Sequence, residues 1–407
     1  MKTIKNLLFL LAFSLVAFNC SSDDDNTTDD GGGDENENIV KTGILTANET
    51  WTSDNIYELD GKVVVNEGVT LTIEPGTIIK GGQGLESLAS ALVVDQGGKI
   101  IANGTASAPI IMTSVLDNIE VGQAAGTNLD QNDTGLWGGL IILGRAPISV
   151  SGNVGTAQIE GIAANEPYGQ YGGDIADDNS GSYKYISVRH GGITIGSDNE
   201  INGITMGGVG TGTVMENLEV VANADDGFEW FGGTVNGKNF ITWAHGDDGL
   251  DADQAWSGTM DNALVIQTSE SGSALELDGP EGTSTNGYTM TNITLIGDAA
   301  NEHFTDCRDG LIANLNNVLA YGFGENTTLR FKDEDSVTEL AADALTFSDW
   351  EIVLPAGVAL ADIVEGAEGN DAKFTDNVTT IESASTATVG ANTSVFGWTY
   401  TASQSAF

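Results

Sequence analysis

The chain has 407 residues and a formal net charge of −45, because 59 acidic side chains face only 14 basic ones. This charge makes nucleic acid an unfavourable partner and divalent cations natural ones. Only two cysteines are present, Cys20 and Cys307, and if Cys20 is lipidated no intrachain disulfide can form, so stability must come from packing and hydrogen bonds.

The first 20 residues have the three-part layout of a secretory signal: two lysines, an apolar run from Leu7 to Phe18, and Cys20. That run is too short to span a membrane. The start resembles a bacterial lipoprotein signal, and Cys-Ser-Ser-Asp-Asp-Asp from Cys20 is similar to the tether that sends lipoproteins of one group of Gram-negative bacteria to the outer face of the outer membrane. We therefore expect a signal peptide over 1–20, lipidation at Cys20, and surface exposure on the bacterial outer membrane.

Residues 21–41 predict a disordered acidic linker. The stretch carries eight acidic residues between positions 23 and 37, three consecutive glycines and almost no apolar side chain. Such a segment cannot bury enough surface to order itself. The folded domain is predicted to begin near Thr42.

The next part of the chain contains short β-branched runs that return after 22 residues. Residues 69–73 return as 91–95, and residues 77–81 return as 99–103. Turn signals close these runs, as stacked parallel strands require. Two stretches, 115–135 and 161–182, interrupt the pattern, and insertions of this kind emerge as loops that often shape a binding face.

Five asparagines in the second half mark a second repeat. Asn217, Asn239, Asn262, Asn292 and Asn317 lie 22, 23, 30 and 25 residues apart, each beside an apolar run. One asparagine and one strand per unit is the pattern of a solenoid of stacked β-coils. The stacked amides are predicted to hydrogen-bond as a ladder along the stack.

The fold class predicted is therefore all-β: a right-handed parallel β-helix with an asparagine ladder. The helix is expected over residues 42–335. Residues 336–407 are expected to add C-terminal coils and a small cap, because an uncovered last coil would expose a strand edge.

A second strand follows three of the asparagines by ten to thirteen residues and carries an acidic residue at its centre. Because side chains alternate along a strand, Glu229, Asp251 and Glu276 are predicted to stack in one outward column. Asp253 and Asp278 follow on the same face.

Like charges spaced by one coil repel by about 1 kcal/mol per pair even in water. Three kinds of compensation are open: a bound Ca²⁺, whose preference for hard oxygen ligands suits carboxylates, raised pKa values, or the cations Arg330 and Lys332. The alternative is a fully solvated acidic face on an acidic protein.

The turns before two of these strands are acidic as well, with Asp225 in one and Asp247 and Asp248 in the next. Paired carboxylates one coil apart can supply the acid and base that cleave a glycosidic bond. Asp-Gly turns also arise from geometry alone.

Three further residues are candidate ligand contacts. Trp243 alternates outward from its strand, Trp256 lies in a loop after an acidic strand, and His245 directly precedes an aspartate pair. Tryptophan beside carboxylates is a sugar-stacking surface, although loop tryptophans also cap hydrophobic ends.

The period, the asparagines and the Gly/Asp turns resemble the right-handed parallel β-helix of the pectate-lyase-like superfamily. The turn motifs are similar to those of polygalacturonases, whose functional pattern matches here at Asn223, Asp225, Asp247, Asp248, Arg330 and Lys332. The family's Gly-His-Gly motif is missing, because residues 269–273 contain no histidine, and one extra coil precedes Arg330.

The leading hypothesis is a non-catalytic surface lipoprotein that binds an extracellular ligand, most naturally a polysaccharide, through a calcium-assisted acidic face, with lipid and an outer-membrane receptor as further partners. One alternative is an enzyme: a hydrolase using Asp225, Asp247 and Asp248, or a Ca²⁺-dependent lyase with Arg330 as base. The other is a structural or adhesive spacer whose carboxylates keep it soluble.

Overall fold

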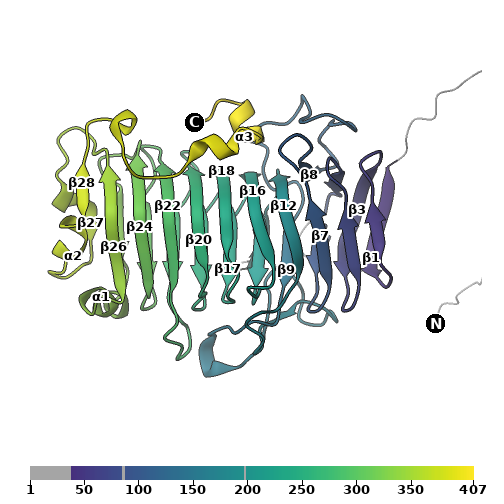
Figure 1. Ribbon diagram of the computed structural model, residues 1–407, viewed down its shortest axis with the longest axis horizontal. Coiled ribbons are helices and arrows are strands. Elements are labelled where there is room, and N and C mark those ends of the chain that lie inside the picture. The colour runs from purple at the N-terminus through teal and green to yellow at the C-terminus, as the bar shows by residue number, and fades with distance from the viewer. Residues whose placement is uncertain (1–37, 85–87, 197–198) are drawn as a thin grey trace, which may run out of the picture. The chain divides into compact units, whose positions relative to one another are not determined.

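The computed structural model describes residues 38–84, 88–196 and 199–407, so the predicted signal peptide, Cys20 and the linker up to residue 37 lie outside it. Within residues 38–407, one 24-stranded sheet with parallel pairings winds into a β-helix (Figure 1). The predicted fold class, an all-β parallel β-helix, is confirmed. The first strand begins at Ile39, so residues 39–41, which were predicted as linker, belong to the first coil of the β-helix.

The strands of the first coils are short and closely spaced. They are β1 (Ile39–Leu45), β2 (Glu49–Trp51), β3 (Ile56–Val65), β4 (Thr70–Ile73), β5 (Ile78–Gly81), β6 (Ala91–Val94), β7 (Lys99–Asn103), β8 (Ile110–Ser114) and β9 (Leu140–Leu143). Two small antiparallel hairpins leave the stack after them: β10 (Ala157–Gln158) with β11 (Gln170–Tyr171), and β13 (Ile193–Gly196) with β14 (Asn199–Ile201).

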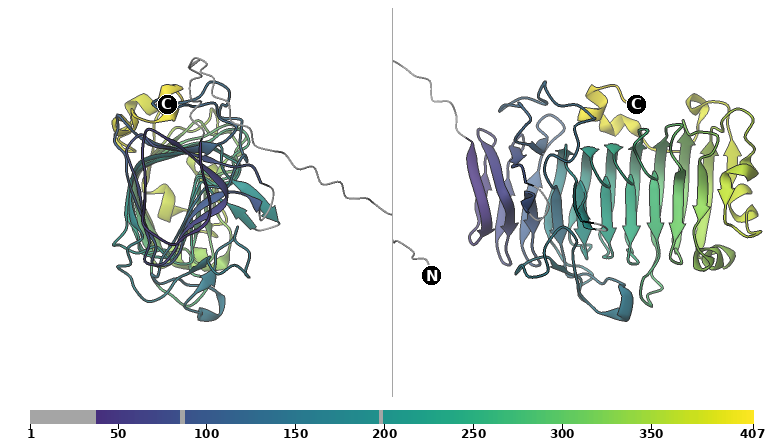
Figure 2. Two further views of the ribbon diagram at one scale, coloured as in Figure 1. Left: turned by 90° about the vertical axis from the view of Figure 1, so that its right-hand side faces the viewer. Right: turned by 180° about the vertical axis from the view of Figure 1, so that it is seen from behind.

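The later coils alternate long and short strands. They are β12 (Gly181–Arg189), β15 (Ile204–Gly207), β16 (Val214–Asn223), β17 (Phe228–Phe231), β18 (Gly237–His245), β19 (Leu250–Asp253), β20 (Thr259–Ile266), β21 (Leu275–Asp278), β22 (Tyr288–Ile296), β23 (His303–Arg308), β24 (Ala313–Tyr321), β25 (Thr328–Phe331), β26 (Leu345–Ile352), β27 (Val364–Glu365) and β28 (Val378–Thr380). Viewed along the stack, the coils superpose (Figure 2).

Each long strand bends in its middle, and the asparagines stand at the bend. Asn217, Asn239, Asn262, Asn292 and Asn317 all have left-handed backbone, with φ between 57° and 72°. Asparagine tolerates this conformation better than most residues, which explains its recurrence. Asn239 donates to Asn217 Oδ1 and Asn262 donates to Asn239 Oδ1, each at 2.9 Å, and Asn317 donates to Asn292. The amides therefore form two asparagine runs, one from Asn217 to Asn262 and one from Asn292 to Asn317. Between the two runs, Asn292 donates to Asp261 instead of Asn262.

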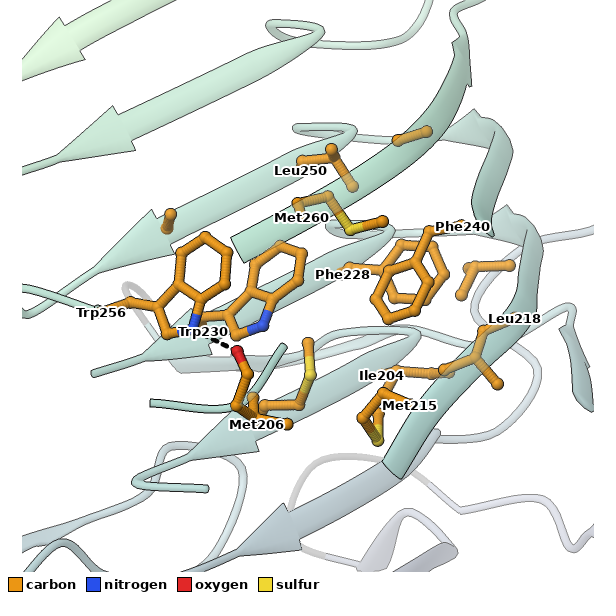
Figure 3. Close-up of a cluster of buried hydrophobic side chains, with 14 of the residues drawn as sticks. Ile204, Met206, Met215, Leu218, Phe228, Trp230, Phe240, Leu250, Trp256 and Met260 are labelled. Carbon is orange, nitrogen blue, oxygen red and sulfur yellow. Dashed lines mark hydrogen bonds between the residues drawn. The ribbon is translucent and has the colours of Figure 1, made fainter. Parts of the chain in front are cut away.

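Aromatic side chains fill the middle of the interior (Figure 3). The rings of Phe228 and Phe240 stack with centroids 4.6 Å apart, and those of Trp230 and Trp256 stack at 4.7 Å. Phe228 and Trp230 alternate inward on β17, so the residue between them, Glu229, points out of the interior.

The two ends of the stack are closed differently. At the first coil, the Lys41 ammonium lies over the stacked rings of Trp51 and Tyr57, 5.9 and 6.0 Å from their centroids, and pairs with Glu49. At the last coils, α1 (Glu334–Ala341) and α2 (Ala372–Thr375) pack against β26. No helix in the described ranges is long and apolar enough to cross a membrane.

Candidate functional site

One outward-facing position recurs in successive coils and forms a continuous column. Its members, in order along the stack, are Ile44, Val64, Val93, Ile141, Thr205, Glu229, Asp251, Glu276, Asp306, Arg330 and Glu365. We call this set the outward column. It is apolar in the first coils and charged in the later ones. The predicted alignment of Glu229, Asp251 and Glu276 is the observed register.

A long connection between β9 and β12 covers the apolar half of the outward column. Val93 and Ile141 pack there against Ile159, Ile162 and Tyr171 in a cluster separate from the main interior. Hydrogen bonds hold this connection to later coils: the Gly233 N–H donates to the Pro147 carbonyl oxygen, and the Tyr171 hydroxyl donates to Gln254. We call residues 144–180 the cover.

The cover extends over the first acidic rungs. The Asn202 amide donates to Glu160 of the cover at 3.2 Å and also to Glu229. Glu229 is only 7% exposed and Glu276 only 9% exposed. The alternative of a fully solvated acidic face is therefore wrong for these two rungs. Glu229 is linked to the cover through Asn202, and Glu276 pairs with Arg308.

Burial changes the acidity of the whole cluster. Desolvation raises the pKa of Glu229 and Asp251 well above the ordinary value, and repulsion from neighbouring carboxylates adds to the effect. The same two causes raise the pKa of Asp225 to about 8 and that of Asp278 to about 9. Burial also raises the pKa of Glu160 to about 7.

Two overlapping groups of carboxylates are close enough to share a cation. Oxygens of Asp226, Glu229 and Asp251 lie within 4.8 Å of one another, as do those of Asp225, Asp226 and Asp247. Such oxygen sets suit a hard divalent cation. Asp251 Oδ1 is buried and has no hydrogen-bond partner, which leaves a ligand atom free.

The structure therefore brings together only part of the predicted metal set. Glu229 and Asp251 meet, whereas Asp253, Glu276 and Asp278 belong to neither of the groups found among the described residues. Asp226 is the residue that sequence reasoning missed. Its position directly before Gly227, in a turn already marked by Asp225, was the available signal.

The last rungs of the outward column are balanced by arginines. Arg308 pairs closely with Glu276, and its Nε lies 2.8 Å from Asp306 Oδ2. Arg330 also binds Asp306, with Nε 2.8 Å from Oδ1. Asp306 is fully buried. The predicted cation Arg330 thus neutralises Asp306, while Lys332 is exposed beyond it.

An open pocket of about 390 Å³ lies at this mixed-charge end. Its lining includes Asp247, Glu270, Glu276, His303, Arg308 and Arg330. The pocket therefore offers carboxylate acceptors and guanidinium donors side by side, next to the buried acidic rungs. Arg308 and His303 were not predicted as site residues.

The turn aspartates divide into two roles. Asp226 Oδ1 accepts a hydrogen bond from the Asp248 N–H at 2.7 Å, and Asp248 Oδ1 accepts one from the Ser273 N–H. Each buried aspartate therefore caps the next coil, which makes Asp248 a structural residue rather than a solvent-facing acid. Asp247 is exposed and Asp225 is half-buried.

The hydrogen bond to Asp306 raises the pKa of Arg330. This shift disfavours Arg330 as the base of a lyase.

The three predicted ligand contacts lie elsewhere. Trp256 is fully buried in the interior against Trp230, because the left-handed residues Gln254 and Ala255 turn the chain inward (Figure 3). His245 is 1% exposed, and burial lowers its pKa to about 3.

Trp243 does alternate outward, as predicted, but it is covered. It is half-buried beneath the C-terminal segment, with its ring stacked on Tyr400 at 6.5 Å. A sugar-stacking surface formed by Trp243, Trp256 and His245 is therefore contradicted, because two of them are internal and the third is covered by residues far away in the sequence.

The family described as pectate-lyase like beta helix domain matches residues 43–402. Neither the curated proteins nor the solved structures include a significant match. The family match spans most of the chain and points to a polysaccharide-related function. The chain belongs to the pectate-lyase-like β-helix family.

Proposed function

We propose that this protein binds an extracellular polysaccharide in the open pocket, with a divalent cation, best Ca²⁺, held by Asp226, Glu229 and Asp251. The observation that carries the proposal is the adjacency of two features on one face. A cluster of buried carboxylates with a free ligand atom lies beside a pocket lined by arginines and exposed acids.

The cation is supported by the electrostatics of the cluster. Two carboxylates within 4.8 Å repel by about 3 kcal/mol at an effective dielectric of about 20. The ion pairs of this face use Arg308 and Arg330, which bind Glu276 and Asp306. A divalent cation would relieve the repulsion among the remaining carboxylates, and the alternative is that they stay protonated.

The polysaccharide is supported by the chemistry of the pocket. Sugar hydroxyls both donate and accept hydrogen bonds, so they need acceptors and donors at close range. The carboxylates of Asp247 and Glu270 offer hydrogen-bond acceptors, and the positively charged guanidinium groups of Arg308 and Arg330 offer donors. Family membership favours the same ligand class.

The cellular setting of the proposal comes from the N-terminal sequence. A lipid on Cys20 would anchor the protein at the bacterial outer membrane, and residues 21–37 would separate the anchor from the β-helix. An outer-membrane receptor is a further partner in this proposal. Replacing Cys20 by Ser should release the protein from the membrane fraction, and retention of this variant would argue against the anchor.

The test of binding is a titration of the purified protein with Ca²⁺, followed by retention of the protein on immobilised glycans with and without Ca²⁺. Binding of Ca²⁺ together with Ca²⁺-dependent retention is expected. The Asp251→Asn variant should lose both effects, whereas Glu216→Gln, which changes a carboxylate of β16 that pairs with Lys184 and belongs to neither carboxylate group, should keep them. Equal behaviour of the two variants would overturn the proposal and favour a spacer.

A hydrolase is the second candidate, favoured by one observation. Asp225, with its pKa raised to about 8, lies close to exposed Asp247, which is the pairing a general acid and its partner carboxylate require. Incubation with neutral and acidic glycans should then release reducing ends, and Asp225→Asn should abolish the release. Binding without any release would leave the non-catalytic function.

A further inference from the structure

The C-terminal residues 388–407 form a segment that we call the strap. After β28, the chain turns back and crosses the outer surface of earlier coils, where it includes α3 (Tyr400–Ser403) (Figure 1). The strap adds no strand to the sheet. At its start, the N–H and the hydroxyl of Thr388 donate to Glu351 of β26, at 2.8 and 2.7 Å. The contacts of the rest of the strap fall into three zones that follow one another along the stack.

In the first zone, three consecutive backbone N–H groups of the strap bind side chains of three coils. Gly390 donates to Asn317 Oδ1, Ala391 donates to Thr294 Oγ1 at 2.8 Å, and Asn392 donates to Asn262 at 2.6 Å. Asn317 and Asn262 are the last members of the two asparagine runs. The strap therefore satisfies the terminal amide oxygen of each run.

In the second zone, the strap covers an apolar stripe. Ile241 and Leu264 point outward from β18 and β20 and are fully buried, and Ile266 is 4% exposed. They pack against Phe396 of the strap, with Trp243 at the margin. Without the strap these side chains would face water, because they lie on the outer surface of the coils.

In the third zone, the strap closes over a buried carboxylate. Glu219 is fully buried and accepts hydrogen bonds from the N–H groups of Tyr400 and Thr401, at 3.0 and 2.8 Å. It also accepts from Ser187. The guanidinium of Arg189 lies 4.7 Å from the centre of the Tyr400 ring. Lifting the strap would remove both backbone donors from a buried carboxylate, so this zone acts as a latch.

We propose that the strap is a conformational device: a cover that opens and closes as one unit, independently of the coils, and bares the apolar stripe when it opens. Two features support this. The strap is tied to the coils by side-chain latches at its two ends rather than by sheet pairing, and residues 382, 383, 385 and 386 in the connection before it are exposed. Segments of this kind open with their own free energy, below that of global unfolding.

The test is hydrogen exchange of the full chain, followed by mass spectrometry, in variants that weaken opposite ends of the strap. Glu219→Gln removes the charge of the latch. Gly390→Ala adds a Cβ that would lie 2.6 Å from Thr294 Oγ1 and 2.8 Å from Leu319 Cβ, at a backbone φ of 104°. Gly397→Ala is the matched control, because a Cβ there meets nothing within 4 Å.

Each weakening variant should speed exchange at least tenfold at both ends of the strap, around 390–392 and around 400–401. Exchange in β18 and β20 should stay unchanged, binding of an apolar dye should rise, and Gly397→Ala should match the parent protein. If each variant speeds exchange only at its own end, or if the strap exchanges at the rate of β18 and β20 in the parent protein, the proposal is wrong.

Discussion

The two halves of the outward column share one backbone geometry and have opposite chemistry. Val93 and Ile141 occupy the same position on their strands as Glu229 and Asp251, yet the first pair packs under the cover and the second pair forms a charged cluster. Register alone therefore does not decide whether an outward face is a site. Side-chain type decides which loops can pack on that face, and the loops decide how much water reaches it.

The largest effect is expected from placing a charge in the apolar half. Ile141→Asp should destabilise the protein by about 4 kcal/mol or more, because Ile141 is 1% exposed and a carboxylate there has no paired cation. Ile44→Asp is the matched control in the same column, since Ile44 is 41% exposed, and it should cost less than about 0.5 kcal/mol. Denaturant midpoints measure the stability of both variants. Equal losses of stability would show that packing under the cover does not determine the cost of a charge at Ile141.

The second effect concerns pH in the acidic half. The raised pKa values of Asp225 and Asp278, about 8 and about 9, mean that the folded state keeps protons that the unfolded state releases above about pH 4. Stability without divalent cations should therefore fall as pH rises from about 4 to about 8. Melting curves with a chelator across this range check the sign, and a rise in stability over the same range would contradict the buried cluster.

The third effect concerns the cation. At a Ca²⁺ concentration of 100 times the dissociation constant, binding should add about 2.7 kcal/mol to the free energy of unfolding. The double variant Glu229→Gln with Asp251→Asn should lose this gain and should be at least as stable as the parent protein without Ca²⁺, because two repelling carboxylates are gone. Melting curves with Ca²⁺ and with a chelator measure both quantities. A double variant that still responds to Ca²⁺ would place the cation elsewhere.

The smallest effect is expected at the mixed-charge end. Arg330→Met removes a charged hydrogen-bond donor from buried Asp306, which Arg308 still contacts, so the loss should be about 1–3 kcal/mol. Glycan retention should weaken in the same variant. Lys332→Met, which changes an exposed neighbour, is the control and should leave stability and retention unaltered. If both variants behave alike, Arg330 has no special part in the pocket.

Several features of the site follow from local pattern. The spacing of the asparagines predicts the coil length, and the coil length predicts that Glu229, Asp251 and Glu276 align. These predictions succeed because a solenoid repeats one local conformation, so sequence separation converts directly into register. The left-handed bend at each asparagine is a local requirement as well.

Other features depend on contacts between distant segments. The Trp256 indole donates to the Val235 carbonyl oxygen inside the coils, Asp248 caps the next coil at Ser273, and Asp306 of β23 binds Arg330 of β25. None of these roles changes the spacing of the sequence repeat, so the repeat alone does not predict them.

The sequence by itself determined the parallel β-helix and the alignment of its acidic rungs, because both follow from a short period and from strand alternation. Only the tertiary structure decided that Glu229 is buried beside the cover and that Trp243 lies beneath the strap. Both coverings come from segments tens to more than a hundred residues away in the chain, and their docking depends on apolar packing and on buried polar groups that no local pattern encodes.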